Sequence, residues 1–440
     1  MNNRRRRIRL NPGSIALLWF MPLLGGCVLQ LGAGNDQGAA GGDTTNPPPG
    51  GGTLTDAQQA RKDEADRYVA QVIYKGAPIL QSLQLASGDI VDGLDRSTFP
   101  ALPSPLPPLP FTPASVILPP DVTLALTEVA QIPELADLAS KAAVFHRPTF
   151  WPYLQGETDA TSLEDYLDRY EVSGAPEGNR LYAGLVSDQP NRGVSGYMNQ
   201  FKPKVAASSF SVLEFTVGCP ANTPTEMVGV VISVDNYNVG GRNQQGVFDG
   251  LPRLHVEYAS SKSGQMKYMW DGLDGSFVTN PTRTVWPGKV VPFSVLGGAQ
   301  VEHLLTIFQS PFGDWWVAYD QVLLGYYPAS LFTLLNAGAC ESRWYGEVYN
   351  PDPKQGAVKT EMGSGQFSEA GRPNVAYVRK PEFYDTSWFS VEPTGLIFAK
   401  PIEPLCYTRS TLDPDPVSGG HIFTLGGPGG KDPGCKWPFP

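Results

Sequence analysis

Short runs of β-branched and aromatic residues, separated by clusters of Gly, Pro and Asn, fill the chain from about residue 146 onward. The clearest runs are Ser211–Val217, Met227–Val234, Arg253–Tyr258, Trp315–Tyr319 and Trp344–Tyr349. Such runs are typical of strands, and the residues between them favour short turns. No repeat of about 20–50 residues is present, so a solenoid or propeller is not indicated. The sequence predicts a mainly β fold, with an antiparallel β-sandwich over residues 146–440.

The region before these strands has a different texture. Apolar residues recur at helical spacing from Ala60 to Ile73; Asp56 is a plausible cap for this helix, and Pro78 would end it. A second helical pattern covers Asp121–Phe145. Between the two, residues 97–120 are rich in proline and are expected to be extended. We therefore expect a helical and Pro-rich N-terminal region over residues 55–145.

The N-terminus carries the features of an export signal. An arginine-rich start precedes Ile15–Leu24, an apolar run too short for a permanent membrane span. The sequence Leu24-Gly25-Gly26-Cys27 resembles a bacterial lipobox, which implies cleavage before Cys27 and acylation of its thiol. We expect a lipoprotein signal peptide over residues 1–26, a flexible tether over 27–54 and a lipid-anchored location in a bacterial cell envelope, facing the periplasm or the exterior. An ordinary secretory signal with an incidental cysteine is the alternative.

Net charge and sequence motifs exclude several classes of function. The formal net charge is −10, and no basic patch follows the signal segment, so nucleic acid is not an expected partner. The four histidines form no HExxH pattern, which argues against a zinc hydrolase. GxSxG, Walker and Rossmann motifs are also missing from the sequence. Without Cys27, four cysteines remain, and an oxidising compartment favours two disulfides with three open connectivities.

Several motifs occur in a telling order. Gly313–Val348 contains a Trp pair, a Gly-Tyr-Tyr-Pro turn and a Trp-Tyr-Gly-Glu strand; a Met-Gly-Ser-Gly turn follows at 362–365. A Cys-Tyr pair at 406–407, Gly-Gly-Pro-Gly at 426–429 and Cys435 end the series. Together these motifs resemble the neprosin domain over roughly Arg180–Cys435. That family contains secreted glutamic endopeptidases that prefer to cut after proline. The resemblance implies a peptide or protein substrate, no cofactor and a two-glutamate mechanism at acidic pH.

Two carboxyl groups can hydrolyse an amide if one accepts a proton from water and the other supplies one. Glu347 matches the glutamate of the family's Trp-Gly-Gly-Glu motif. The second carboxyl is open: aligning glutamates with the family's Glu-Ala-Gly-Trp selects Glu226, whereas aligning glycines puts Met227 there. Glu214 lies where the family carries Gln and could supply the carboxyl from the neighbouring strand. A one-residue shift reverses the face of a strand side chain, although a β-bulge could restore Glu226.

Three further residues are candidates for substrate binding. Trp316 and Trp344 would suit a cleft that stacks on proline rings, and Ser364 could reach the glutamates by a hydrogen bond. Core packing is the alternative for the tryptophans, and a tight hairpin for Ser364. If no working pair of glutamates exists, the alternative function is a non-catalytic envelope lipoprotein whose sandwich cleft binds peptides or glycans.

The resemblance also implies how the cysteines pair and how the chain is processed. Cys406 and Cys435 occur in the order of the family's terminal pair, and elimination then suggests Cys219 with Cys340. Similar family members often carry a removable propeptide. We therefore expect residues 55–145 to restrain the cleft, with cleavage between about Pro105 and Pro120 at acidic pH.

Overall fold

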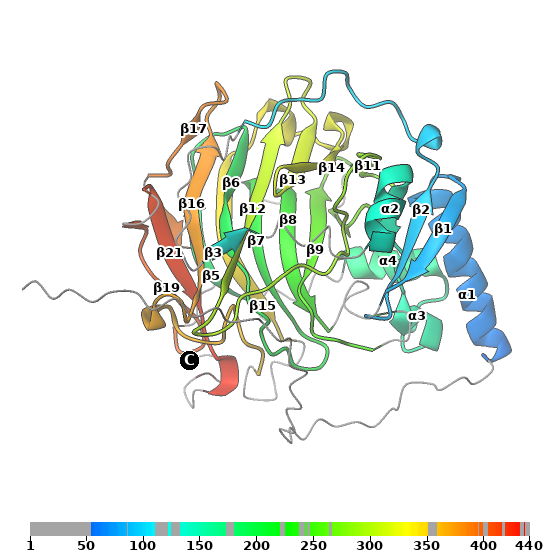
Figure 1. Cartoon of the computed structure of the whole chain (residues 1–440), viewed down its shortest axis with the longest axis horizontal. Helices are drawn as coiled ribbons and strands as arrows, with labels where there is room; N and C mark the ends of the chain where they lie inside the picture. The colour runs from blue at the N-terminus through cyan, green and yellow to red at the C-terminus, as the bar shows by residue number, and fades with distance from the viewer. Residues whose placement is uncertain are drawn as a thin grey trace, which may run out of the picture. The chain divides into compact units, whose positions relative to one another are not determined.

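Two sheets, antiparallel except for one pairing, form the centre of the fold in this computed structural model (Figure 1). The structure describes residues 54–85, 87–110, 122–124, 133–172, 180–220, 225–236, 243, 247–263, 266–350, 359–394, 396–398, 404–415, 419–431 and 435. These residues belong to one compact unit, 48–440. The signal segment, Cys27 and the Gly-rich tether to residue 53 lie outside the described residues, as do Phe111–Pro120.

The smaller sheet of the sandwich has seven strands, in the order β10-β9-β8-β7-β15-β5-β18. Its strands are β5 (Arg180–Ser187), β7 (Phe210–Pro220), β8 (Thr225–Asp235), β9 (Arg253–Ser260), β10 (Lys267–Trp270), β15 (Glu341–Tyr349) and β18 (Ile397–Phe398). All its neighbouring strands run antiparallel. The expected runs at 211–217, 227–234, 253–258 and 344–349 are thus confirmed as strands of one sheet.

The larger sheet has eleven strands and follows the path β11-β14-β13-β12-β6-β16-β21-β19, with β3, β17 and β20 attached. Its strands are β3 (Val122–Leu124), β6 (Gly193–Asn199), β11 (Val278–Thr279), β12 (Gln300–Gln309), β13 (Trp315–Tyr319), β14 (Val322–Tyr327), β16 (Ala376–Tyr384), β17 (Ser390–Val391), β19 (Thr408–Arg409), β20 (Asp413–Pro414) and β21 (His421–Gly426). β13 coincides with the expected run at 315–319. Only the pairing of β3 with β12 is parallel among the described strands.

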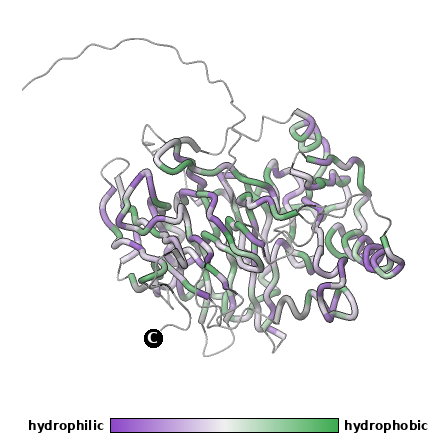
Figure 2. Tube along the Cα trace, turned by 90° about the horizontal axis from the view of Figure 1, so that it is seen from below, coloured by the Kyte–Doolittle hydropathy of each residue, from purple (hydrophilic) through white to green (hydrophobic). Residues whose placement is uncertain are grey.

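The two sheets bury a shared core. On β7, Leu213, Phe215 and Val217 point into it, and the residues between them point the other way, as the two-residue period of a strand requires. Figure 2 shows this mixture of hydrophobic and hydrophilic positions along the strands. Burying side chains of this size contributes about 1.5–3 kcal/mol each. The predicted antiparallel β-sandwich is therefore confirmed.

The first helix is confirmed, with a different cap. α1 (Asp56–Tyr68) continues into a π-helical turn, Val69–Ile73. The cap is Thr55, whose hydroxyl accepts from the Gln58 backbone while the Gln58 side chain accepts from Thr55. Thr55 has the extended backbone of a cap, whereas Asp56 is the first helical residue. The prediction of Asp56 as the cap was wrong by one position.

The second expected helix was too long. α2 spans only Pro133–Lys141, within the 121–145 pattern. β4 (Ala143–His146) follows and joins β1 (Ile79–Gln84) and β2 (Ile90–Leu94) in a three-stranded sheet that the sequence did not reveal. The spacing of apolar residues did not separate this short helix from the strand after it, because a short apolar run fits both the 3.6-residue period of a helix and the two-residue period of a strand.

Two more helices, α3 (Trp151–Gln155) and α4 (Leu163–Val172), precede β5. Short 3₁₀ turns complete the secondary structure at Arg96–Thr98, Ala329–Leu331, Leu335–Ala337, Ser368–Ala370 and Gly429–Lys431. α4 contacts β10, so the N-terminal helices reach the edge of the seven-stranded sheet. No helix in the described part of the chain is long and apolar enough to cross a membrane.

Two disulfides fix the sandwich. Cys219 at the end of β7 is bonded to Cys340, and Cys406 is bonded to Cys435. Both expected pairings are therefore confirmed. The first closes a loop of 121 residues in sequence and the second a loop of 29. Crosslinks that close loops of this length stabilise a fold by roughly 2–4 kcal/mol, chiefly by restricting the unfolded chain.

Candidate functional site

Three glutamates gather on the face of the seven-stranded sheet that points away from the core. Glu214 lies on β7, Glu257 on β9 and Glu347 on β15. Glu214 faces Tyr345 across the β7–β15 pairing, two residues from Glu347 on the same face. The three side chains are buried, with relative exposures of 3%, 1% and 4%. We call Glu214, Glu257 and Glu347 the carboxyl cluster.

Two glycines make room for this cluster. A Cβ atom at Gly229 would lie 2.4 Å from an Oε of Glu257, its partner across the β8–β9 pairing. A Cβ atom at Gly184 would lie 2.3 Å from the Cβ of Tyr345, its partner on β15. Real Cβ atoms do not approach other heavy atoms this closely. Both sites therefore need glycine so that the larger side chains can lie across the sheet surface.

Glu214 and Glu257 share a side-chain hydrogen bond. Burial raises the pKa of Glu214 well above its usual range, and the charges of Glu257 and Glu347 raise it further. Burial also raises the pKa of Glu257 to about 7, although hydrogen bonds from Tyr268 and Glu214 oppose this shift. Two carboxylates this close cannot both ionise easily, so one proton stays between them far above the pH at which a solvated glutamate loses it.

Hydroxyl groups surround the pair. The Tyr268 hydroxyl donates to Glu257, and a side-chain hydrogen bond links Tyr345 to Glu214. Burial raises the pKa of both tyrosines well above the usual range, and the nearby carboxylates raise it further. These tyrosines are therefore neutral donors at acidic and neutral pH. They can support negative charge on the pair without contributing charge of their own.

Glu347 has a different environment. It forms an ion pair with the guanidinium of Arg180, which lies at the start of the neighbouring strand β5. Burial lowers the pKa of Arg180, but the charge of Glu347 and nearby tyrosines outweigh this and raise it above the ordinary value. The cluster thus combines a pair that retains a proton with a carboxylate held beside a fixed positive charge. Both groups needed for general acid and general base chemistry are present.

Glu226 lies elsewhere. β8 pairs with β7 without a register shift, so no bulge turns Glu226, and it faces the same side as the core residues Val228 and Val230. Its carboxylate is fully buried and accepts hydrogen bonds from the backbone of Thr333, Leu334 and Leu335 at 2.6–3.0 Å. The structure does not bring Glu226 to Glu347.

Met227, the residue selected by aligning glycines, pairs with Gly218 and Ala259 and is partly exposed. By strand alternation it lies on the face of Gly229 and the carboxyl cluster. The carboxyls of the cluster come from β7, β9 and β15, and β8 contributes none of them. Glu214, the other candidate, is the one that the structure places near Glu347.

The expected substrate-binding residues do not meet the cluster. Trp344 is fully buried in the core, with its indole nitrogen 3.0 Å from the Ser195 carbonyl oxygen that accepts its hydrogen bond. Trp316 is fully buried on the outer face of the larger sheet. The Ser364 hydroxyl donates to the Asn374 carbonyl oxygen at 2.7 Å, outside the turn, and the Gly365 N–H donates to the Met362 carbonyl oxygen within it. Packing for the two tryptophans and a tight turn for Ser364, the alternatives given above, agree with these contacts.

Glu257 was missed from the sequence. It lies in His-Val-Glu-Tyr, a strand without a family motif, and a single acid in a strand is usually a solvated edge residue. One available signal was the position of Gly229 on the preceding strand, because a glycine inside a strand often marks a close approach by another group. That signal points to Glu257 only when the register of β8 with β9 is known, and the sequence alone does not give this register.

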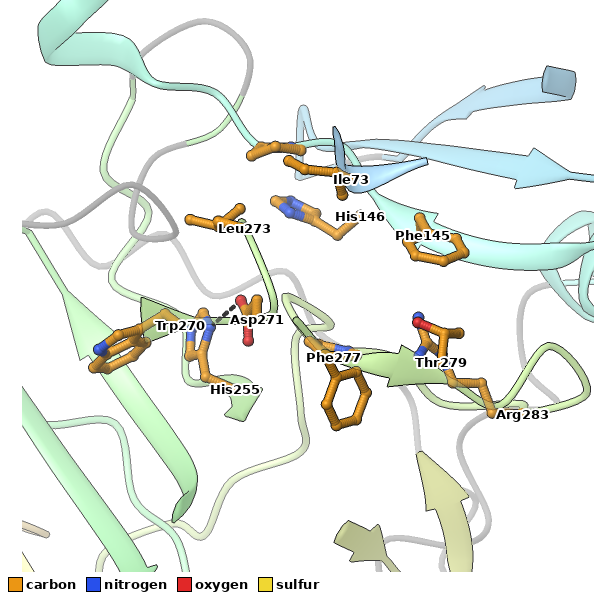
Figure 3. A pocket seen from close by; sticks show the side chains of 12 residues that line it. Ile73, Phe145, His146, His255, Trp270, Asp271, Leu273, Phe277, Thr279 and Arg283 are labelled. Atoms are coloured by element: carbon orange, nitrogen blue, oxygen red, sulfur yellow. Dashed lines mark hydrogen bonds and ion pairs between the residues drawn. The ribbon is translucent and has the colours of Figure 1, made fainter. Parts of the chain in front are cut away.

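A pocket lies at the β9–β10 end of the sheet (Figure 3). It is lined by Ile73 and Phe145 of the N-terminal region, by His146 directly after that region, and by His255, Trp270 and Leu273. The Nδ1 of His255 is 2.7 Å from an Oδ of Asp271, and the rings of His255 and Trp270 meet edge to face at 5.0 Å. Trp270 pairs directly with Glu257, so the N-terminal region closes a space beside the carboxyl cluster.

Part of the chain matches a known protein family. Residues 228–428 match the family model described as Neprosin. The neprosin match includes Glu257 and Glu347, whereas Glu214 and Glu226 precede it. Within the described ranges, no group of three or more His, Cys, Asp or Glu side chains is arranged to hold a metal ion.

Solved structures give weaker likenesses. Scytalido-glutamic peptidase with a peptide-based transition-state analogue aligns at 9% identity and a TM-score of 0.29, over 56% of this chain and 97% of that chain. SCP-B, a member of the eqolisin family of peptidases in complex with the tripeptide Ala-Ile-His, aligns at 7% identity and a TM-score of 0.25, over the same shares of both chains. TM-scores this low carry no argument about the fold, which is therefore described from the strands of this chain alone.

Proposed function

We propose that this protein is a glutamic peptidase that uses the carboxyl cluster to hydrolyse peptide bonds. The observation that carries the proposal is the hydrogen-bonded pair Glu214–Glu257, which retains a proton, beside the ion-paired Glu347. The neprosin match over residues 228–428 supports the same reaction class.

In the proposed reaction, the Glu347 carboxylate takes a proton from a water molecule, and the water oxygen attacks the peptide carbonyl carbon. The proton held between Glu214 and Glu257 passes to the substrate, first supporting the carbonyl oxygen and then neutralising the leaving nitrogen. The tyrosine donors at the pair stabilise the carboxylate that remains. After the products leave, transfer of the proton from Glu347 to the Glu214–Glu257 pair restores the starting state.

The proposed substrates are proline-containing peptides, and the proposed setting is a bacterial cell envelope with a lipid anchor at Cys27. Substrate preference follows the neprosin resemblance, and the anchor follows the N-terminal sequence. Neither depends on the geometry of the carboxyl cluster, so each needs its own test. Mass spectrometry of the purified mature protein would detect an acylated Cys27 as a fixed mass increment on the first peptide.

The N-terminal region is proposed to act as a propeptide. The carboxyl cluster is buried, α4 contacts β10, and Ile73 and Phe145 form part of the wall beside His255. A peptide substrate must reach Glu257 and Glu347 along this face. Displacement of the N-terminal region would open the β9–β10 end of the sheet and give substrate a path to the cluster.

A non-catalytic envelope lipoprotein remains the second candidate function. It is favoured by the burial of all three glutamates, because a binding protein could keep a satisfied carboxyl network as a structural element. On that alternative the sheet face binds peptides or glycans without cutting them. The two functions differ in one measurement, which is product formation.

The deciding experiment is digestion of a proline-rich peptide at acidic pH. Wild type, Glu347→Gln and Glu361→Gln should be compared after matching their folded fractions by circular dichroism. Glu361 is a suitable control because it is also a buried glutamate, but it accepts a backbone hydrogen bond from Lys204 away from the cluster. We expect wild type and Glu361→Gln to cut the peptide and Glu347→Gln to be inactive. Binding without cutting by all three proteins would favour the second candidate.

A further inference from the structure

The described part of the Pro-rich segment is seated on the larger sheet. We call residues 99–110, with the sequence FPALPSPLPPLP, the proline strap. Leu102 and Leu109 of the strap pack against the cluster Tyr197, Leu304, Phe308, Trp316, Ala318, Leu323 and Tyr384. Figure 1 shows the strap in light blue, passing from the N-terminal sheet across the ends of the strands near β13 and β12. The strap therefore covers an aromatic patch away from the carboxyl cluster.

Strand alternation builds this aromatic patch. On β13, Trp315 and Val317 point into the core, whereas Trp316 and Ala318 point outward. Trp316 faces Tyr326 on β14, and their rings lie 4.7 Å apart at 32°. Across the other side, Trp316 pairs with Phe308 of β12. An outward row of aromatic side chains on a sheet is unusual unless something covers it.

The strap is suited to such a row and is held there lightly. Half of its twelve residues are prolines, which favour an extended polyproline conformation. None of the hydrogen bonds found among the described residues involves positions 101–110, and Pro105, Leu106 and Pro108 are exposed. Its attachment therefore rests on apolar contacts: Phe99 stacks on Phe145 at its start, and Leu102 and Leu109 pack on the aromatic patch.

One donor in the patch is unused. The indole N–H of Trp316 is buried and has no acceptor among the described residues. Leaving such a donor unpaired costs roughly 1–3 kcal/mol. An extended proline-rich chain exposes backbone carbonyl oxygens at regular intervals, and aromatic-lined grooves recognise such chains through stacking and indole donors. A proline-rich chain bound in a different register could place a carbonyl oxygen where it accepts the hydrogen bond of the Trp316 indole, which the strap does not do.

We propose that the outward aromatic patch around Trp316 is a binding site for extended proline-rich peptides, and that the strap is its displaceable resident. The site lies on the larger sheet and does not depend on the chemistry of the carboxyl cluster. It would hold a proline-rich stretch of a partner protein or substrate outside the cleft. An external peptide must compete with a covalently linked strap, whose effective concentration is in the millimolar range for a short linker.

The test uses the full chain and a fluorescein-labelled peptide with the strap sequence, residues 99–110. The double variant Leu102→Ser, Leu109→Ser should release the resident strap while leaving the patch intact. Fluorescence polarisation should show at least tenfold tighter binding of the peptide to this variant than to wild type. A control peptide with all prolines replaced by alanine should bind neither protein.

Two further variants, made within the double variant, identify the site. Trp316→Phe keeps an aromatic ring but removes the indole donor, and should weaken peptide binding at least fivefold. Trp388→Phe is the matched control, because Trp388 is 38% exposed and its indole donates to the Gln309 carbonyl oxygen. It should leave binding unchanged.

The proposal is overturned if the folded double variant does not bind the proline peptide, or binds the alanine peptide equally well. If the double variant does not fold, the single variants Leu102→Ser and Leu109→Ser answer the same question, with a smaller gain in affinity expected from each. Peptidase activity is not a readout here, so failure of this site and failure of the proposed function are separate results.

Discussion

Glu214 of β7 and Glu257 of β9 are joined by a side-chain hydrogen bond across the intervening strand β8. The position between them on β8 is open because Gly229, which pairs with Glu257, has no side chain. Only one of the two carboxyls can ionise without placing like charges together in a buried site. This pair therefore retains a proton on the outer face of the seven-stranded sheet, and Glu347 is the carboxylate beside it.

The first prediction concerns the pH dependence of peptidase activity. Burial raises the pKa of Glu257 to about 7, so wild-type kcat/KM should fall as the pH rises through about 7, where Glu257 ionises and the pair is left with one proton. Glu257→Gln removes a charge that raises the pKa of Glu214, so the falling limb should move to lower pH. Loss of a general acid typically costs about 10²–10⁴ in rate. A pH–rate profile of the variant that overlays the wild-type profile would remove Glu257 from the mechanism.

The second prediction concerns stability. The pKa of Glu257 rises from 4.5 to about 7 on folding, so the folded chain holds more protons than the unfolded chain between these values. Stability should therefore fall as the pH rises from about 4.5 to 7, by on the order of 3 kcal/mol from this group. Glu257→Gln cannot ionise, so its unfolding free energy relative to wild type should increase over that range. Urea unfolding at several pH values measures the difference, and a constant difference would contradict the shift.

Five strands of the sandwich were predictable from sequence because the run that forms each one carries its own signal. Runs such as 315–319 combine β-branched and aromatic residues with turn residues on both sides, and tertiary packing did not override them. The helical pattern at 121–145 failed because short apolar runs do not distinguish a helix from a strand. The three-stranded N-terminal sheet depends on contacts between segments far apart in sequence, and no local pattern encodes them.

The candidate site was less predictable, because the residues that meet in it depend on the register of neighbouring strands and on the sheet face to which each side chain points. Glu226 and Met227 are adjacent in sequence, yet they point to opposite sides of β8, and no single-sequence argument fixes which one faces Glu347. Glu257 joins the cluster only through the register of β8 with β9. Trp344 lies in a motif next to Glu347, but it points into the core because the strand alternates.

The third prediction tests the structural role of Glu226. Its carboxylate accepts three backbone N–H groups from residues 333–335, in a fully buried position beside the Cys219–Cys340 disulfide. Glu226→Gln replaces one acceptor oxygen with a donor that faces another donor. Hydrogen bonds to charged groups contribute about 1.5–3 kcal/mol each, so urea unfolding should show a loss of about that size. Peptidase activity per folded molecule should be unchanged; a selective loss of activity would return Glu226 to the candidate site.

The last prediction concerns self-processing. Pro105 and Pro108 are exposed, as a proteolytic substrate requires. If the protein cuts after proline, acidic pH should produce new N-termini between about Pro105 and Pro120, a stretch of which residues 111–120 lie outside the described part of the chain. The cut would separate α1, β1 and β2 from the sandwich and free the catalytic domain from an anchor at Cys27.

N-terminal sequencing and mass spectrometry of wild type and Glu347→Gln after incubation at low pH provide the test. Wild type should be cut and Glu347→Gln should stay intact, because the variant lacks the proposed base. Adding a trace of wild type to Glu347→Gln then separates the routes: cleavage of the variant means that one molecule can process another, whereas an intact variant means that the cut is made within one chain. Full activity on external peptides by a chain that remains uncut would show that release of the N-terminal region is not required for substrate to reach the carboxyl cluster.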